Sequence, residues 1–315
     1  MRARRTALGA TGRVLGAALA AALTLGVAGS PSGAEGDRTT PASARATSWQ
    51  PAGSFTTSAP VTGLDVDPAG RVVVATEDRR VRTHDRTGEV VSTFRAPIPP
   101  GSLDVAVDGL VHLMVDPGAG AVNRTMRVFG PRGRLVRTYG RNLPVAGGFQ
   151  VVEDLRRVIY ADGIDDKIRT YDTRTGAEVD TWGENGNDGT NPPGRLDFAA
   201  DLALLSESRL VVADSGRKVL LVFGRGGRHL RTLGERYFGN RVRRVAAGGG
   251  RLFGLEPGGE RSQVEMFSET GTHLRTLRTD VRRAADLAVS PDGRTLFVAG
   301  ELPSGEPGVI RYVRR

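Results

Sequence analysis

Residues 227–234 read GRHLRTLG, and four other segments of the 315-residue chain repeat this pattern. The other copies are GEVVSTF from Gly88, GRLVRTYG from Gly133, GAEVDTWG from Gly176 and GTHLRTLR from Gly271. Successive glycines lie 45, 43, 51 and 44 residues apart. A regular period of this size indicates a repeat architecture in which each copy forms one supersecondary unit.

Three apolar segments of strand length precede each of these glycines. The nearest segment centres on an aromatic residue, at Phe129, Tyr171, Phe223 and Phe267, with His84 in the same place of the first unit. The segment before it ends in an acid, at Asp116, Asp162, Asp214 and Glu256, and a shorter apolar segment opens each unit. Four short strands separated by Gly, Pro, Asn and Asp are typical of a propeller blade. Beyond residue 46, no stretch has the apolar period of an amphipathic helix.

The length of the chain predicts the number of blades. Residues 49–315 number 267, and one sixth of this length is about 44.5, which matches the spacing of the glycines. The last unit, from Asp286, supplies three strands, and the segment SWQPAGSFTT from Ser48 has the character of the missing fourth. We therefore predict an all-β fold over residues 48–315. It is a six-bladed β-propeller of four-stranded antiparallel blades, closed by the N-terminal strand joining the last blade.

The first 34 residues have the plan of a signal peptide. Arginines precede the apolar run VLGAALAAALTLGVA, which ends at Ala28 and is too short to span a bilayer. We predict a signal peptide over residues 1–34, cleaved after Ala28 or Ala34, and a flexible linker over residues 35–47. The expected location is secreted, with export by the Sec route; the pair Arg4 and Arg5 leaves the twin-arginine route open.

Composition narrows the classes of partner. The absence of cysteine excludes disulfides, thiolate metal sites and cysteine nucleophiles. The formal charge of +9 falls to +5 once residues 1–34 are removed, because they carry four arginines and no acid. No aromatic residue is interleaved with the basic cluster to stack a base, so we expect no nucleic-acid partner. We also expect a monomer with no integral membrane association after cleavage.

The repeat resembles a known family. A glycine-rich lead-in, a short apolar strand, a VAD strand and an aromatic strand before the glycine pattern are similar to the NHL repeat, most clearly over residues 182–234. The resemblance covers the whole predicted domain but lacks the proline that usually precedes the first strand, except at Pro60. It implies a fold shared by many six-bladed enzymes and many non-enzymatic binders, and it does not assign a function.

The loops that enter the innermost strands of a propeller converge on its central channel, where ligands usually bind. The positions that open the six units are Gly63, Ser102, Gly148, Asp201, Arg244 and Asp286. Two residues further on, the first three units have Asp65, Asp104 and Gln150, whereas the later units have alanine. This polar arc is compatible with a hydrated channel wall or with oxygen ligands of calcium, the one cofactor left open.

A basic cluster lies at the start of two neighbouring units. Its members are Arg241, Arg243, Arg244, Arg282 and Arg283. Arginine forks of this kind recognise carboxylates and phosphates. Asp280 and Asp286 lie nearby in the sequence, so neutralising ion pairs are an equal alternative.

Other polar residues have structural interpretations. The recurring acids are expected to cap turns by accepting backbone N–H bonds. Of the four histidines, His229 and His273 are expected to face solvent on outer strands, and His84 and His112 to belong to the core. Arg137, Arg231 and Arg275 are expected to be solvated charges that discourage edge pairing. The loop from Gly183 to Gly194 lacks the acid spacing of a calcium loop.

No nucleophile, acid–base pair or metal set emerges from these residues. We therefore predict a secreted, non-catalytic binding or scaffold module with a protein or cell-envelope polymer bound over the channel mouth. The predicted ligand-binding residues are Asp104, Asp201, Arg243, Arg244, Arg283 and Asp286. The alternative is a metal-dependent enzyme similar to six-bladed lactonases, lyases or sugar dehydrogenases, with Asp104, Asp201 and Asp286 around a divalent metal.

Overall fold

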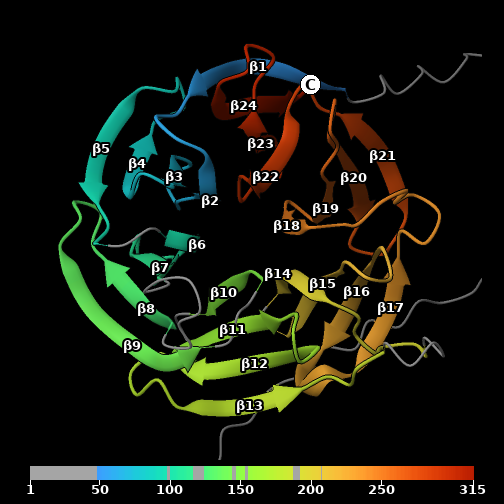
Figure 1. Cartoon of the computed structure of the whole chain (residues 1–315). Helices are drawn as coiled ribbons and strands as arrows, with labels where there is room; N and C mark the ends of the chain where they lie inside the picture. Colours follow the sequence, from blue (N-terminus) through green and yellow to red (C-terminus); the bar gives the residue numbers. More distant parts are fainter. Residues whose placement is uncertain are drawn as a thin grey trace, which may run out of the picture. The chain divides into compact units, whose positions relative to one another are not determined.

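The computed structural model describes residues 48–97, 100–115, 124–143, 147–152, 155–186, 192–206 and 208–315. These residues form six four-stranded antiparallel sheets around a central axis (Figure 1), which confirms the six-bladed β-propeller. Within these ranges a 3₁₀ turn covers Arg225–Gly227, and none of the helical segments has the length and apolar character of a membrane span. The predicted signal peptide and the linker over residues 35–47 lie outside the described residues.

Each blade runs in chain order from the channel outward. Blade 1 contains β2 (Val61–Val66), β3 (Val72–Thr76), β4 (Arg80–His84) and β5 (Val90–Arg95). Blade 2 contains β6 (Pro100–Val105), β7 (Val111–Val115), β8 (Arg124–Phe129) and β9 (Leu135–Leu143). Blade 3 contains β10 (Phe149–Val152), β11 (Arg157–Asp162), β12 (Lys167–Asp172) and β13 (Glu178–Trp182).

The second half of the ring repeats this order. Blade 4 contains β14 (Ala199–Ser206), β15 (Arg209–Asp214), β16 (Val219–Gly224) and β17 (His229–Leu233). Blade 5 contains β18 (Arg244–Gly248), β19 (Arg251–Glu256), β20 (Gln263–Ser268) and β21 (His273–Arg278). Blade 6 contains β22 (Arg282–Val289), β23 (Thr295–Glu301), β24 (Pro307–Arg314) and, outermost, β1 (Trp49–Thr56).

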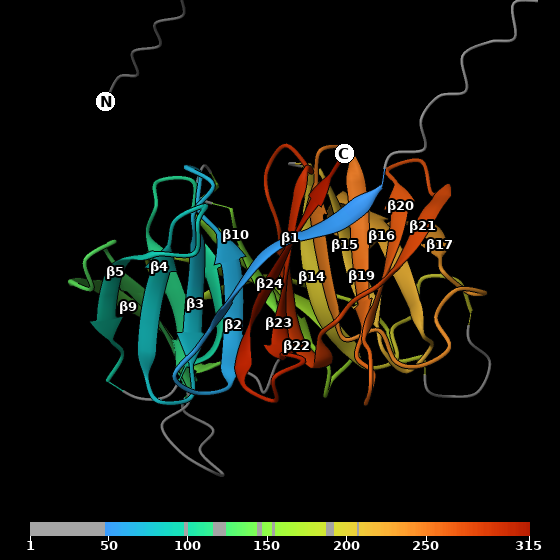
Figure 2. The same cartoon turned by 90° about the horizontal axis from the view of Figure 1, so that it is seen from above.

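The first described strand closes the ring. β1 runs along the outside of β24 (Figure 2) and pairs with it antiparallel, from Trp49 opposite Arg314 to Thr56 opposite Gly308. Backbone hydrogen bonds between Ser48 and Arg315, at 2.9 and 3.1 Å, extend the pairing to the end of the chain. The predicted closure is therefore confirmed, and the last blade has the same four strands as the others.

The apolar core lies between the blades. Buried apolar side chains form six clusters, and each cluster joins two neighbouring blades. The ring is continuous because blade 6 packs on blade 1 through residues such as Phe297 and Val74. Trp49 extends the interface between blades 5 and 6, where its ring meets Phe253 edge-on at 5.8 Å between centroids. Because the ring is continuous, each blade packs against a neighbouring blade on both of its faces.

The glycine that marks each repeat has two roles at once. Gly133, in the turn between β8 and β9, has a φ of +79°, which side chains other than glycine seldom adopt. A Cβ at this position would also lie 2.2 Å from the Cβ of Phe94, on the outer strand of the preceding blade. Gly227 lies under Trp182 in the same way. In these two repeats, the glycine of one unit and the aromatic residue that ends the previous unit form one inter-blade contact, whereas Gly271 faces Leu233.

Candidate binding face at the channel mouth

The innermost strands of all six blades line a central cavity of about 510 Å³. Here we call the end at which these strands begin the mouth. The structure brings four of the predicted residues into this lining, namely Asp104, Asp201, Arg244 and Asp286, together with Asp65, Gln150 and Ser102. Arg243 and Arg283 lie outside the channel, beside a separate hollow at the mouth. The predicted set is thus divided between two neighbouring cavities.

The channel aspartates connect adjacent blades. Each accepts a hydrogen bond from a backbone N–H on the innermost strand of the next blade. Asp65 bonds to Val105 at 2.7 Å, Asp104 to Val151 at 2.8 Å, Asp201 to Val245 at 2.9 Å and Asp286 to Leu64 at 2.8 Å. We call these four bonds the inter-blade clasps. They close the inner ring at four of the six blade interfaces.

The second oxygen of three of these carboxylates is also engaged. Oδ1 of Asp65 accepts the N–H of Val66 at 2.7 Å, and Oδ1 of Asp286 accepts that of Leu287 at 2.9 Å. Oδ1 of Asp104 accepts the side-chain amide of Gln150 at 2.6 Å. The carboxylates that the sequence suggested for a ligand are therefore used largely by the fold. The repeat pattern alone did not indicate this role, because the aspartates lie at one level in the first two units and at another level in the fourth and sixth.

Burial dominates the electrostatics of the channel. It raises the pKa of Asp201 to about 7 and that of Asp65 to about 6. The pKa of Asp104 is raised well above its usual range, first by burial and then by the charge of the neighbouring Asp65. Burial also raises the pKa of Asp286, and the Arg244 guanidinium, with Nε 3.4 Å from Oδ1, opposes this rise. Near neutral pH the channel thus holds fewer negative charges than carboxyl groups.

The calcium expectation gains no support from this arrangement. Among the described ranges, no three Asp, Glu or His side chains are grouped so that they could hold a metal ion. Carboxylate oxygens that already accept N–H bonds have fewer lone pairs left for a cation. A calcium site at Asp104, Asp201 and Asp286 remains a prediction.

The basic cluster lies at the mouth, as its position in the repeat predicts. Arg243, Arg244 and Arg283 line a hollow of about 510 Å³ together with the loop from Pro257 to Gly259. Arg243 is exposed and makes no ion pair with any residue in the described part of the chain. Arg283 is 78% exposed and lies 3.6 Å from Glu301, which also faces Arg282. Asp286 pairs with Arg244, whereas Asp280 pairs with Arg261, so the cluster is only partly neutralised.

Of the recurring acids, Asp162 and Asp214 act as predicted, whereas Glu256 does not. Asp162 accepts the N–H groups of Ile164 and Asp165, and Asp214 accepts those of Arg217 and Asp197. Glu256 instead accepts the N–H of Gly239 from a separate loop, at 3.0 Å. Asp116 and residues 187–191 of the glycine-rich loop lie outside the described residues.

Two of the histidine interpretations are confirmed. His84 is buried and stacks on Phe55 of β1 at 4.0 Å, and His112 is buried with Nδ1 3.0 Å from the Tyr139 hydroxyl. The expectation for His273 is wrong, because it is half-buried, stacks on Tyr237 at 3.7 Å and lies 2.7 Å from the buried Glu265. His229 is also half-buried, which the repeat alone did not indicate.

The outer-strand arginines are less solvated than predicted. Arg137, Arg231 and Arg275 are all half-buried. Arg231 donates to the carbonyls of Glu269 and Thr270 in the turn of the next blade. The reason is the same as for the repeat glycines, because each outer strand packs against the blade that follows it.

Comparison with known proteins does not assign a family or a function to the chain. No protein-family model matches the chain, and no curated protein matches it either.

Proposed function

We propose that this propeller is an exported, non-catalytic binding module of the NHL-repeat type, which holds an acidic group of a protein or cell-envelope partner at the channel mouth. The main support is the difference between the side chains that line the central channel and those that line the arginine hollow at its mouth. The channel carboxylates accept hydrogen bonds from neighbouring blades, whereas Arg243 and Arg283 present exposed guanidinium groups around a hollow. The recurring glycine pattern supports the relation to NHL repeats, and the apolar run before Ala28 supports export.

The hollow suits an anionic group for a physical reason. Its arginines come from two blades, with Arg243 and Arg244 from blade 5 and Arg283 from blade 6. A planar guanidinium offers parallel N–H donors to a carboxylate or phosphate, and two or three of them around one hollow fix the position of the ligand. Arg244 is already oriented by Asp286, so Arg243 and Arg283 are the residues that we expect to contact the ligand.

Binding of poly-L-glutamate and of inorganic polyphosphate to the purified protein tests this proposal. We expect affinity to fall with added salt, and Arg243→Gln combined with Arg283→Gln to weaken binding at least tenfold. The matched control is Arg132→Gln combined with Arg156→Gln, which removes the same charge from exposed turns at the opposite end of the blades. Equal loss in both double variants, or no binding of either polymer, contradicts the proposal.

The enzyme alternative rests on one observation. Asp65 and Asp104 both line the channel with raised pKa values, and perturbed acids in a cavity are typical of catalytic sites. This reading predicts that calcium stabilises the protein against thermal unfolding, by about 2.7 kcal/mol at 100 times the dissociation constant. Asp104→Asn should abolish the effect. An unfolding temperature that does not change with calcium contradicts a calcium-dependent enzyme.

A further inference from the structure

Phe198, immediately before β14, has an unusual combination of properties. Its φ is +60°, a region that bulky residues rarely adopt, and its side chain is 41% exposed. The backbone is fixed on both sides, because its N–H donates to Oδ1 of Asp166 at 2.6 Å and its carbonyl accepts from Ser215 at 3.0 Å. A strained conformation that exposes an apolar ring does not help the core, and strain of this kind is often kept for a ligand.

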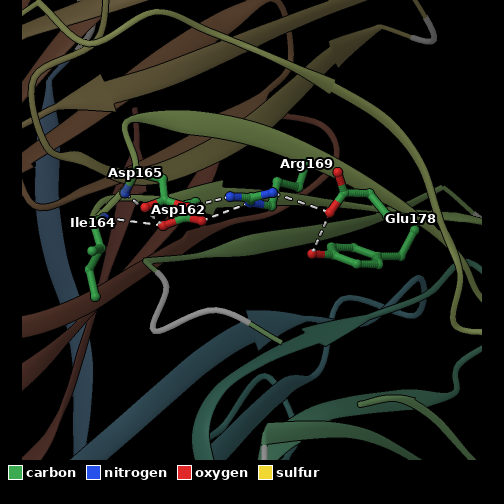
Figure 3. A network of polar contacts seen from close by, with 6 residues as sticks. Asp162, Ile164, Asp165, Arg169 and Glu178 are labelled. Carbon is green, nitrogen blue, oxygen red and sulfur yellow. Dashed lines mark hydrogen bonds and ion pairs between the residues drawn. The ribbon is translucent and has the colours of Figure 1, made fainter. Parts of the chain in front are cut away.

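Ile164 lies in the turn between β11 and β12 and is 62% exposed. Figure 3 shows how this turn is fixed: buried Asp162 accepts the N–H of Ile164 at 3.2 Å and pairs with Arg169 at 2.8 Å. Arg169 also pairs with Asp165 of the same turn and with Glu178 of β13, which accepts the Tyr171 hydroxyl as well. The turn is therefore a rigid support for an exposed aliphatic side chain.

Ile164 and Phe198 line the same small cavity. Its volume is about 180 Å³, and its other walls are Gly147, Gly163, Ala199, Ala200, Arg243 and Arg244. A Cβ on Gly163 would lie 3.7 Å from the Phe198 ring, so the turn and the ring are neighbours. The cavity is apolar on the side of blades 3 and 4 and is bounded by two arginines of blade 5. We call it the mouth pocket.

We propose that the mouth pocket binds a protein segment that inserts one aliphatic or aromatic side chain between Ile164 and Phe198 and places an adjacent carboxylate on Arg243. The proposal rests on the function proposed above and specifies its partner. The volume suits a single apolar side chain, and Arg243 makes no ion pair within the described part of the chain. A phosphate or sugar polymer matches the arginines and leaves the apolar walls without a contact, so the pocket favours a protein.

The test compares three synthetic hexapeptides, acetylated and amidated at their ends, by isothermal titration calorimetry. The first, GSLDES, combines leucine with two acids; GSSDES lacks the apolar side chain and GSLNQS lacks the charges. We expect the first peptide to bind at least tenfold more tightly than either of the others, because burying a leucine-sized side chain and pairing a carboxylate each contribute that much. Arg243→Gln should remove the preference for the acids.

The Phe198→Gly variant tests whether the Phe198 ring contacts the ligand in a protein that should remain folded. Glycine adopts a φ of +60° without strain, so this variant should unfold at the same temperature as the natural protein or higher, while its preference for leucine over serine falls below twofold. Arg156→Gly is the control, since Arg156 is exposed with a φ of +50° at the other end of blade 3 and should leave peptide binding unchanged.

The outcomes distinguish the two proposals. An unchanged leucine preference in Phe198→Gly overturns this inference. Binding of inorganic polyphosphate or poly-L-glutamate without leucine preference among the peptides also overturns it, and leaves the anion-binding function standing. If no acidic peptide or polymer binds, both proposals are wrong.

Discussion

At the scale of single residues, glycines with the same backbone conformation differ in what surrounds the position of their missing Cβ atom. Gly133 combines a φ of +79° with direct contact to Phe94, whereas Gly109 has the same φ and no atom of another residue near its missing Cβ. The two positions share their backbone conformation and differ in the neighbouring blade. They therefore separate the contribution of the turn from that of inter-blade packing.

Gly133→Ala and Gly109→Ala measure this difference. We expect Gly109→Ala to lower the free energy of unfolding by about 1 kcal/mol through backbone strain alone. Gly133→Ala should lower it by a further 1–3 kcal/mol or so, because the methyl group must displace Phe94. Urea denaturation at one pH checks both values. Equal effects in the two variants would mean that the contact with the preceding blade contributes nothing.

Some features of single residues cannot be predicted from the sequence repeat. The strained φ of Phe198 involves Asp166, 32 residues earlier, and the partial burial of His273 involves Tyr237 together with Glu265. Asp166 and Tyr237 lie in turns, outside the strands that carry the repeat pattern. Periodicity predicts which residues are equivalent between blades, and it cannot predict contacts that are made in only one of them.

At the scale of strands and blades, the innermost strands are held together by charged side chains in a buried setting. A clasp runs from each of β2, β6, β14 and β22 to the next blade. The sequence located these aspartates in the channel but did not predict their partners. Three of the hydrogen bonds span 40 to 47 residues and the fourth spans 222, and a backbone N–H has no sequence signature. The clasps give these four channel acids a structural role in joining neighbouring blades.

Asp201→Asn tests the clasp through pH. The pKa of Asp201 is raised from 3.8 to about 7, so the folded state holds a proton that the unfolded chain releases. The stability contributed by this group is full below pH 3.8 and is lost as the pH rises through 7. From pH 5.5 to 8.5 the natural protein should lose on the order of 2 kcal/mol relative to Asp201→Asn, which keeps an acceptor for Val245.

Other groups titrate in the same range. Comparison with the variant cancels those that do not interact with Asp201, whereas Asp104 and Asp286 do interact with it. Burial lowers the pKa of His84 and lowers that of His112 to about 4, so these histidines favour the folded state as the pH rises to 6.5. Burial raises the pKa of Asp214 to about 7, which acts in the opposite direction. Parallel curves of unfolding free energy against pH for the natural protein and Asp201→Asn would contradict the raised pKa.

At the scale of the whole molecule, the ring is held by a contact between the two ends of the folded chain. Six repeats of similar length predicted the number of blades, and a last unit with one strand missing predicted the closure. Closure places the first residues of all six units at one end, where the arginine hollow and the mouth pocket lie. A different register or an open ring would separate these residues and remove the basis for the proposed binding face.

A designed disulfide between β1 and β24 tests the closure most directly, because the chain has no cysteine of its own. Gln50 and Val313 are Cα partners in the two strands, so Gln50→Cys with Val313→Cys should form a bond under mild oxidation and raise the unfolding temperature. Ser54→Cys with Val313→Cys is the control, since Ser54 pairs with Ile310 and lies about 10 Å away along the strand. Rapid bond formation in the first pair alone is the result that we predict; equal formation in both pairs, or none in the first, would contradict a ring closed in this register.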